Sequence, residues 1–557
     1  MNEVDYVIVG AGSAGCVLAA RLSEDPNVSV ALLEAGGRDT SVLIHAPAGV
    51  VAMAPTRINN YAYKTVPQPG LNGRRGYQPR GKTLGGSSSI NAMLYVRGNR
   101  RDYDHWAQLG NAGWSYQDVL PYFKRAEHNE QFNDAFHGQG GPLNVTYSRY
   151  ESAISKMFLD AAALNGITAN PDYNGAEQEG AFLYQVTHKN GERFSAAKAY
   201  LTPNLGRKNL TVFTDAHTTR VLFEGKRATG IEFMRDGRLQ QIGANHEVLM
   251  AAGALQTPQL LMLSGVGPGA ELAKLGIGVV RDLPGVGRNF HDHVDVVQVV
   301  DAPKLVDTFG VSLTGIARVT KAIFEWRNKR SGMLTTNFAE AGGFIRSQPS
   351  EDIPDLQLHF VVGKLIDHGR KTVFGHGYSA HVCLLRPLSR GSVTLASRDP
   401  MAAPLIDPNF FDHPDDMRRL VRGFRQMRAI MSQPALAKLG GKELARSANA
   451  TSDAEIEQFI RAYGDTIYHP VGTCRMGPGE MDVVAPDLRI HGLEGIRVVD
   501  ASIMPRVVGG NTNAPVIMVA EKASDMIKAA RAAGAGSAQA VRAVASPRGP
   551  VTEQIAA

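Results

Sequence analysis

Hydrophobic residues near the start of the chain change their spacing at a cluster of glycines. A short β-branched apolar run ends at residue 9, glycines follow at positions 10, 12 and 15, and apolar residues then recur at helical spacing over 17–22. A second apolar run covers residues 30–33. Short apolar runs of this kind are typical of buried parallel strands. The pattern therefore predicts a strand, a tight turn, a helix and a second strand.

Alternating apolar and polar positions predict further strands in the middle of the chain. The runs at 210–213, 220–223, 230–233 and 247–251 indicate a β-meander that returns to the first sheet. The last run leads to Thr257 and Pro258, which predict the N-cap and first position of a short buried helix that ends before Gly265.

Residues 306–464 differ in pattern from the preceding chain, because alternating runs such as 356–362 and 381–385 are mixed with charged helical stretches such as 415–431. We expect an α/β fold in which a substrate domain, a mostly antiparallel sheet with helices, is inserted into a Rossmann-like domain. A strand at 495–500 and a helix at 515–530 return to the first fold. The expected division is 1–155, 205–305 and 465–532 for the nucleotide domain, 156–204 and 306–464 for the substrate domain, and a disordered tail at 533–557.

The glycine cluster has the spacing G-x-G-x-x-G. Gly10 permits the turn, Gly12 lets a pyrophosphate approach the backbone, and Gly15 lets the helix pack closely on the strand. The helix N-terminus offers free N–H groups to the phosphates. Glu34 ends the second strand, where its carboxylate can accept from a ribose hydroxyl and disfavours a 2′-phosphate. The glycines alone are a weak signal, but with both strands, the helix and the acid they predict a bound adenine dinucleotide.

The composition is ordinary for a soluble enzyme of about two structural units. The chain has 557 residues, and lysine plus arginine exceed aspartate plus glutamate by six without forming runs, which does not favour nucleic-acid binding. Three cysteines argue against a disulfide framework, and the His-Asp-His run at 291–293 lacks a third ligand for a metal. No apolar stretch has the length of a transmembrane helix and no leader precedes the first strand. We expect a cytoplasmic protein, with association to the inner face of a membrane left open.

Three further segments carry candidate chemistry. Residues 79–93 are rich in glycine and small hydroxyl side chains, which allow close approach to a flat or phosphorylated ligand, although a flexible loop has the same composition. Pro470 keeps the backbone of His469 out of the α region. In 510–515, an Asn-Thr-Asn run can cap the helix that Pro515 opens. If a flavin lies there, the positive end of that helix favours the negative charge of the reduced ring.

From residue 5 to about 530, these motifs in this order resemble the glucose-methanol-choline (GMC) oxidoreductase family, above all its bacterial alcohol dehydrogenase and choline dehydrogenase branches. The segments at 81–93, 253–267, 283–289, 468–470 and 499–502 carry the resemblance together with the glycine cluster. The resemblance implies FAD, bound by Gly10, Gly12, Ser13, Ala14, Gly15, Glu34, Ala35, Gly81, Thr83, Gly85, Gly86, Ser87, Asn91, Ala92, Met93, Val221, Gly253, Asp500, Ala501, Asn511 and Thr512. Members with covalent flavin have histidine where this chain has Ile90, so noncovalent FAD is expected.

The resemblance also implies a reaction. His469 takes the place of the catalytic histidine and Asn513 that of its partner. His469 would accept the hydroxyl proton of a primary alcohol while a hydride passes to flavin N5, and a quinone, an electron-transfer protein or oxygen would take the electrons. Choline is the alternative substrate, since Glu340 resembles a carboxylate of the choline-oxidising branch that could hold a quaternary ammonium, unless it is a structural acid. A lyase of this family and a noncatalytic flavin-binding protein are the other classes.

Overall fold

The glycine cluster joins the first strand of a seven-stranded sheet to its first helix. The computed structural model describes residues 2–305 and 308–544. Four strands pair in parallel in the order β11 (Leu210–Phe213), β2 (Val30–Leu33), β1 (Asn2–Val9) and β14 (Arg238–Met250), and the end of β14 also pairs in parallel with β25 (Ile496–Val498). Helix α1 (Ser13–Leu22) follows β1. This strand order confirms the Rossmann-like α/β prediction.

The predicted meander is present, but one of its strands belongs elsewhere. β12 (His217–Glu224), β13 (Arg227–Arg235) and the first half of β14 pair antiparallel as expected. The run at 210–213 instead forms β11, parallel to β2. The alternation of apolar and polar residues within a strand does not specify which strand pairs with it. The helical segment before β11 forms a crossover that places β11 beside β2.

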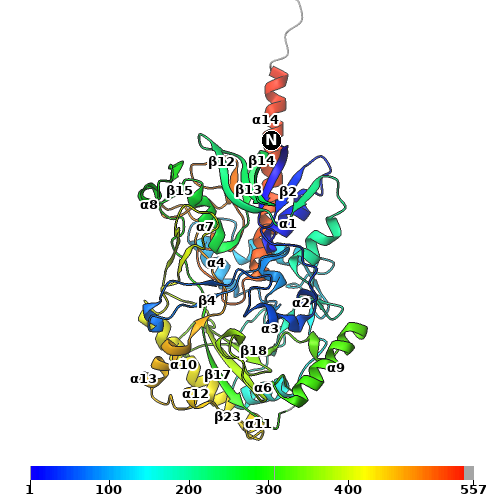
Figure 1. Ribbon diagram of the computed structural model, residues 1–557, viewed down its shortest axis with the longest axis vertical. Helices are drawn as coiled ribbons and strands as arrows, with labels where there is room; N and C mark the ends of the chain where they lie inside the picture. The colour runs from blue at the N-terminus through cyan, green and yellow to red at the C-terminus, as the bar shows by residue number, and fades with distance from the viewer. Residues whose placement is uncertain (1, 306–307, 545–557) are drawn as a thin grey trace, which may run out of the picture.

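The second sheet confirms the inserted antiparallel domain (Figure 1). Its order is β23 (Lys442–Glu443), β17 (Val294–Asp301), β20 (Gly377–Leu384), β19 (Leu356–Val361), β18 (Ala339–Ile345) and β7 (Gly180–Leu183), with β24 (Asp465–Thr466) also beside β17. β17 lies before the expected domain boundary at residue 305, so the chain enters this sheet earlier than composition indicated. Helices α6 (Ala153–Leu164) and α10 (Pro414–Met431) pack on the sheet.

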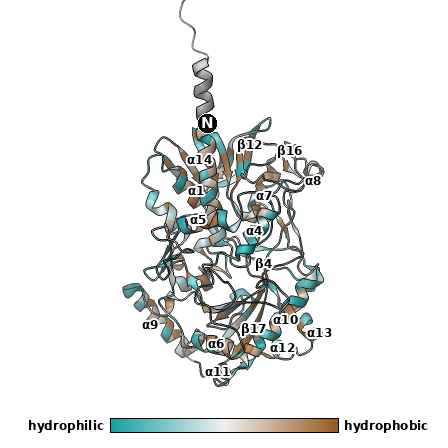
Figure 2. Ribbon diagram, turned by 180° about the vertical axis from the view of Figure 1, so that it is seen from behind, coloured by the Kyte–Doolittle hydropathy of each residue, from teal (hydrophilic) through white to brown (hydrophobic). Residues whose placement is uncertain are grey.

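Each sheet has its own hydrophobic core. One core surrounds β1, β2 and β14, and the other surrounds β17 to β20 and the inner faces of α6 and α10. In Figure 2 the region of β17 is brown, whereas the outer helices carry teal segments as well. The substrate cavity described below lies between these two cores.

Helix α7 (Gly253–Leu263) begins four residues before the predicted N-cap at Thr257, and Pro258 lies inside it. Asp500 caps the true start, because its carboxylate accepts from Gly253 N at 2.9 Å and from Thr257 Oγ1 at 2.6 Å. Proline lacks the N–H that would bind the carbonyl of Ala254, and the Thr473 hydroxyl donates to that oxygen at 2.6 Å instead. Two distant side chains thus permit a start that the local sequence does not predict.

Helix α14 (Asn513–Val544) starts two residues before Pro515, and Thr512 O accepts from Val516 N at 3.1 Å. Pro515 still lies in the first turn, where its missing N–H costs nothing. The helix continues past residue 533, where the tail was expected to begin, because alanine is the strongest helix former. Residues 545–557 lie outside the described residues. Within the part of the chain that the structure describes, no helix is long and apolar enough to span a membrane.

Candidate active site

A single large cavity runs from the glycine cluster to the face of the second sheet. Its volume is about 1900 Å³, whereas a pocket for one drug-sized ligand has roughly 300–1,000 Å³. The lining comes from both sheets, with Val9 and Leu33 at one end and Val297 and Val361 at the other. The cavity therefore has room for a dinucleotide and a second, smaller molecule.

The dinucleotide end fits the group that the glycine spacing predicts. Gly10 has φ +98°, and a Cβ on Gly15 would lie 1.9 Å from the carbonyl oxygen of Gly10, so the helix packs on the strand as expected. A Cβ on Gly12 would meet nothing closer than 4.0 Å, because this residue faces the cavity. Burial raises the pKa of Glu34 to about 7, and its carboxylate accepts from Ala11 N and Gly36 N.

Most of the predicted cofactor residues line this cavity. They are Gly10, Gly12, Ser13, Ala14, Glu34, Ala35, Gly81, Gly86, Ser87, Asn91, Ala92, Met93, Gly253, Asp500, Ala501, Asn511 and Thr512. Four others do not line it: Gly15, Thr83, Gly85 and Val221. Thr83 and Gly85 bind the loops to each other, through Thr83 Oγ1 to Gly37 O at 3.0 Å and Gly85 N to Ala11 O at 2.8 Å.

Val221 lies on β12, and its side chain is buried in the hydrophobic core of the first sheet. Its N–H donates to Ser264 Oγ at 2.8 Å. Residues 216–218, at the start of the same strand, line the cavity instead. No local pattern distinguishes these positions, because the direction of a side chain depends on how the strand packs.

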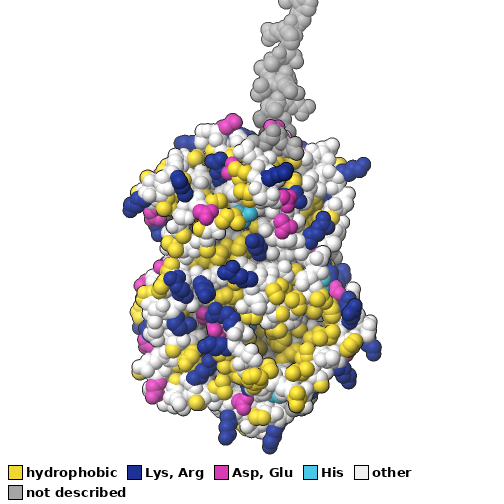
Figure 3. Space-filling model, in the orientation of Figure 1, with side chains coloured by type: hydrophobic (Ala, Val, Ile, Leu, Met, Phe, Trp, Pro, Cys, Tyr) yellow, Lys and Arg dark blue, Asp and Glu magenta, His cyan; other side chains and the backbone are white. Residues whose placement is uncertain are grey.

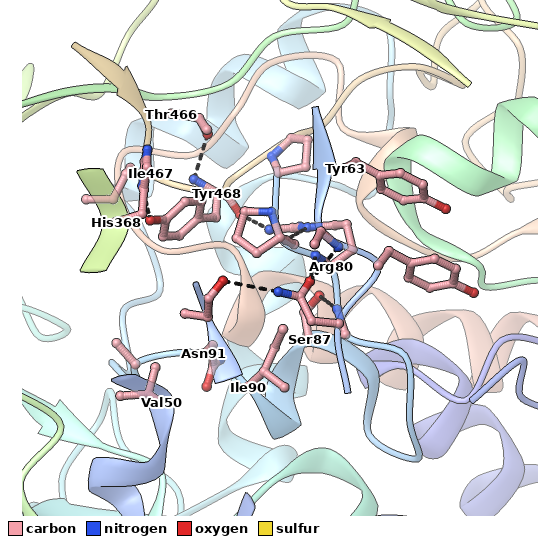
Figure 4. Close-up of a pocket in the computed structure, with 18 of the residues that line it drawn as sticks. Val50, Tyr63, Arg80, Ser87, Ile90, Asn91, His368, Thr466, Ile467 and Tyr468 are labelled. Atoms are coloured by element: carbon pink, nitrogen blue, oxygen red, sulfur yellow. Dashed lines mark hydrogen bonds between the residues drawn. The ribbon is translucent and has the colours of Figure 1, made fainter. Parts of the chain in front are cut away.

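Ile90 and Asn91 lie on the cavity wall (Figure 4). Ile90 packs in a small cluster with Ile44 and Met53. Asn91 is held by the buried Arg193, whose Nη1 donates to Asn91 O at 2.6 Å and to Asn91 Oδ1 at 2.9 Å. Sequence reasoning missed Arg193, because arginine is usually a surface residue.

His469 is fixed by its backbone. Its N–H donates to Asp292 Oδ1 at 2.8 Å, and the other carboxylate oxygen of Asp292 accepts from Thr466 Oγ1 at 2.5 Å. The preceding residue, Tyr468, has φ +74°, which is strained for a bulky side chain. Arg80 Nη2 holds the carbonyl of Tyr468 at 2.6 Å (Figure 4). Asp292 therefore positions His469.

The ring of His469 lies in a hydrogen-bonded chain that determines its tautomer. His293 Nε2 lies 3.0 Å from Leu385 O, and His293 Nδ1 lies 3.0 Å from His469 Nδ1. Because a carbonyl can only accept, His293 carries its proton on Nε2, and in the neutral ring Nδ1 must then accept. His469 consequently donates from Nδ1, which leaves the lone pair of Nε2 without a proton.

Asn511, rather than Asn513, reaches this lone pair. Asn511 Nδ2 lies 3.1 Å from His469 Nε2, whereas Asn513 Oδ1 accepts from Ser13 Oγ at 2.6 Å. Both asparagines line the cavity. The predicted pairing of His469 with Asn513 is corrected accordingly. The error is of two positions in an Asn-Thr-Asn run, in which either amide could be the one that points to the histidine.

Burial shifts the pKa of His469 well below that of an ordinary histidine, and His293, His359 and Arg80 add to the shift. Burial likewise lowers the pKa of His293 to about 3. Both rings are therefore neutral at pH 7, in agreement with the tautomers that the hydrogen bonds require. A neutral imidazole whose Nε2 carries no proton can accept one.

A second polar cluster, consisting of Asp295, His359 and His381, lies on the cavity face of the second sheet. His359 is paired with His381 in the β19–β20 register, and His381 Nδ1 lies 2.7 Å from Asp295 Oδ2. Asp295 Oδ1, His381 Nε2 and both nitrogens of His359 have no hydrogen-bond partner among the described residues. Buried polar atoms are usually satisfied, so these atoms fit a polar group of a bound molecule. Sequence reasoning missed them, because the three residues lie far apart in the chain.

Glu340 lies on β18 and does not line the cavity. Its carboxylate accepts from Ser152 N, Ser152 Oγ, Ser155 Oγ and Thr336 Oγ1 at 2.6–2.8 Å. Four donors occupy the lone pairs of this buried acid. Of the two interpretations of Glu340, the structural acid is therefore the one supported.

The chain matches the two GMC oxidoreductase family models over residues 4–295 and 387–520. It is 48% identical to an alcohol dehydrogenase (acceptor) of Pseudomonas putida, covering 94% of this chain and 95% of the relative. It is 44% identical to the mitochondrial choline dehydrogenase of Homo sapiens, covering 95% and 90%. A solved FAD-dependent oxidoreductase from Chaetomium thermophilum has a TM-score of 0.86 at 28% identity, covering 95% and 99%. The cavity and these likenesses identify FAD as the cofactor, and the chain belongs to the GMC oxidoreductase family.

Proposed function

We propose that this enzyme oxidises an uncharged primary alcohol, aliphatic or aromatic, to the aldehyde and passes the electrons to a quinone-like acceptor. The observation that carries the proposal is the unprotonated Nε2 of His469, which lies in the same cavity as the glycine cluster. The likeness to an alcohol dehydrogenase (acceptor) supports both the substrate class and the kind of acceptor.

His469 accepts the hydroxyl proton of the alcohol at Nε2. The Nδ1–H of the same ring continues to donate to His293 Nδ1. The imidazolium that forms therefore keeps this hydrogen bond and its orientation. Asn511 Nδ2 is close enough to donate to the alcohol oxygen as its negative charge develops, and positioned donors of this kind contribute about 3 to 4 kcal/mol in known enzymes. When bound, FAD supplies a two-electron acceptor for the hydrogen on the alcohol carbon.

The lowered pKa of His469 limits how the proton can leave. With a pKa of about 15.7 for the hydroxyl, taken from water, and about 6.5 for histidine, complete proton transfer would cost about 12 kcal/mol. Burial lowers the pKa of His469, so the cost is higher still. The alkoxide must therefore be short-lived, with the carbon-bound hydrogen leaving in close succession.

Choline is the second candidate, because Asp295 places one carboxylate in the cavity. His381 already binds one oxygen of that carboxylate, and the four hydroxyl and amide donors around Glu340 occupy the other acid considered for this role. An uncharged substrate is thus preferred. Specificity constants for choline and for a medium-chain primary alcohol decide between them, and a higher value for choline would reverse the choice.

The main experiment measures anaerobic flavin reduction by an alcohol in single-turnover stopped flow. His469→Ala should retain FAD but reduce it about 10² to 10⁴ times more slowly, the usual contribution of a positioned base. His469→Gln, which fills similar space without a basic nitrogen, should be equally slow. Near wild-type reduction in His469→Gln would exclude the proposed role. Absence of flavin bleaching in the wild type with every alcohol tested would instead favour a lyase.

A further inference from the structure

Helix α9 (Leu313–Lys329) exposes large hydrophobic side chains to solvent. Leu313 is 89% exposed, Ile316 60% and Phe324 64%. Leu313, Ile316 and Phe324 share one side of α9 with Thr320, at helical spacing. This side lies opposite the buried Ala322 and Trp326. An amphipathic helix normally turns its apolar side inward. This helix therefore has a second apolar side, which no described residue covers.

The exposed side of α9 continues into neighbouring segments. Val311 forms a backbone bridge with Phe374, which is 76% exposed. Val51, on α3 (Val50–Met53), is 49% exposed. We call the set the apolar rim: Val51, Val311, Leu313, Ile316, Phe324 and Phe374.

The apolar rim borders the mouth of the active-site cavity. Val51 and Val311 belong to the rim and also line the cavity, as do Val319 on α9 and Val373 beside Phe374. Figure 3 shows hydrophobic side chains gathered around a hollow on this face, where Figure 1 draws α3 and α9. Exposed apolar patches of this extent mark interaction sites. A molecule that enters the cavity here passes between apolar side chains.

The charges around the rim are mostly positive. Helix α9 has four basic residues and one acidic residue, Glu325, and the exposed Lys371 lies three residues before Phe374. In Figure 2, α9 shows both teal and brown segments. Two copies of the chain meeting through this face would bring like charges together, which disfavours a dimer. Apolar side chains flanked by lysine and arginine instead match a bilayer with anionic headgroups.

We propose that the apolar rim docks the enzyme on an anionic lipid bilayer, with the cavity mouth facing the membrane. Leu313, Ile316, Phe324 and Phe374 enter the interface, and Lys321, Arg327 and Lys371 lie at the level of the headgroups. Apolar alcohols and quinones dissolved in the bilayer then reach the cavity without crossing water. The docking itself does not depend on which alcohol is oxidised.

Vesicle co-sedimentation of the full-length holoenzyme tests the docking directly. Wild type should bind phosphatidylcholine vesicles that contain phosphatidylglycerol, bind pure phosphatidylcholine more weakly, and lose affinity as salt is added. The double variant Leu313→Gln/Phe324→Gln should lower the partition coefficient at least about tenfold, because each side chain buries most of its surface in the interface. Leu239→Gln is the matched control, since Leu239 is 55% exposed on β14, a strand of the first sheet and not of the apolar rim.

Flavin content and melting temperature of the variants verify the fold, since none of these residues touches the catalytic groups. A water-soluble alcohol should be oxidised at the same rate by the double variant and the wild type. Equal vesicle binding by the double variant and the Leu239→Gln control would overturn the proposal. So would a dimer of the wild type, seen by sedimentation without lipid and abolished by the same double substitution, because a second copy would then be the occupant of the rim.

Discussion

His293 offers a sharp test of the hydrogen-bonded chain that orients the proposed base, His469. His293→Phe removes the acceptor of His469 Nδ1–H and the donor to Leu385 O, both at 3.0 Å in a site that is fully buried. His469 can then place its proton on either nitrogen, and only one of the two tautomers leaves Nε2 unprotonated. The two rings also contact each other edge to face, with centroids 5.1 Å apart, and phenylalanine retains this contact.

The expected magnitude follows from the buried group that is left unpaired. An unsatisfied buried donor costs about 1–3 kcal/mol, and about 1.4 kcal/mol corresponds to a factor of ten. The rate constant of flavin reduction should therefore fall by about 5- to 150-fold in His293→Phe. His293→Gln, whose amide can accept from His469 and donate to Leu385, should recover much of this loss.

The assay is anaerobic stopped-flow reduction over a range of alcohol concentrations. The limiting rate constant should change while the apparent dissociation constant for the alcohol stays near the wild-type value, because His293 acts through His469. Equal FAD content and melting temperature among the three proteins exclude general misfolding. The reasoning is refuted if His293→Phe, intact by these criteria, reduces its flavin within twofold of the wild-type rate, or if the Gln and Phe variants are equally slow.

Three further predictions address the cofactor, the amide donor and the pH dependence of stability. Since Ile90 cannot form a histidyl bond, acid precipitation should release all FAD into the supernatant, and colour remaining in the pellet would contradict this. Asn511→Ala should slow flavin reduction by about 10- to 10³-fold, whereas Asn513→Ala, which loses only the hydrogen bond from Ser13, should change the rate less; the opposite order would restore the assignment made from sequence. Burial opposes the charge of His137, but Asp172 and Glu127 raise its pKa to about 9. Protonated His137 therefore stabilises the fold, and this contribution is complete below pH 6.5 and is lost as pH rises through 9. It amounts to at most about 3 kcal/mol. The melting temperature should consequently fall more steeply with rising pH in the wild type than in His137→Gln.

The sequence by itself determined the features that depend on local spacing. The change from a β-branched run to helical spacing at Gly10, Gly12 and Gly15 sufficed for the strand, turn and helix of the dinucleotide site, because these glycines are required by backbone geometry within one turn. Glu34 was predicted to line the dinucleotide site from its position at the end of the next strand. The alternating runs of the inserted domain likewise predicted β19 and β20, since side chains alternate between the two faces of a strand. Both strands are buried on both faces, which the alternation did not indicate.

The tertiary structure alone decided which side chains meet. Asp295, His359 and His381 converge on the cavity only because β17, β19 and β20 are neighbours in one sheet. Asn511 rather than Asn513 faces His469 because α14 starts at Asn513, which binds Ser13 of α1. These contacts join residues far apart in the chain, and neither the register of strands nor the rotation of a helix against its neighbour is encoded in a local pattern. The sequence thus specified the cofactor and the proposed base, His469, while packing between distant elements determined the tautomer of His469 and its hydrogen-bond partners.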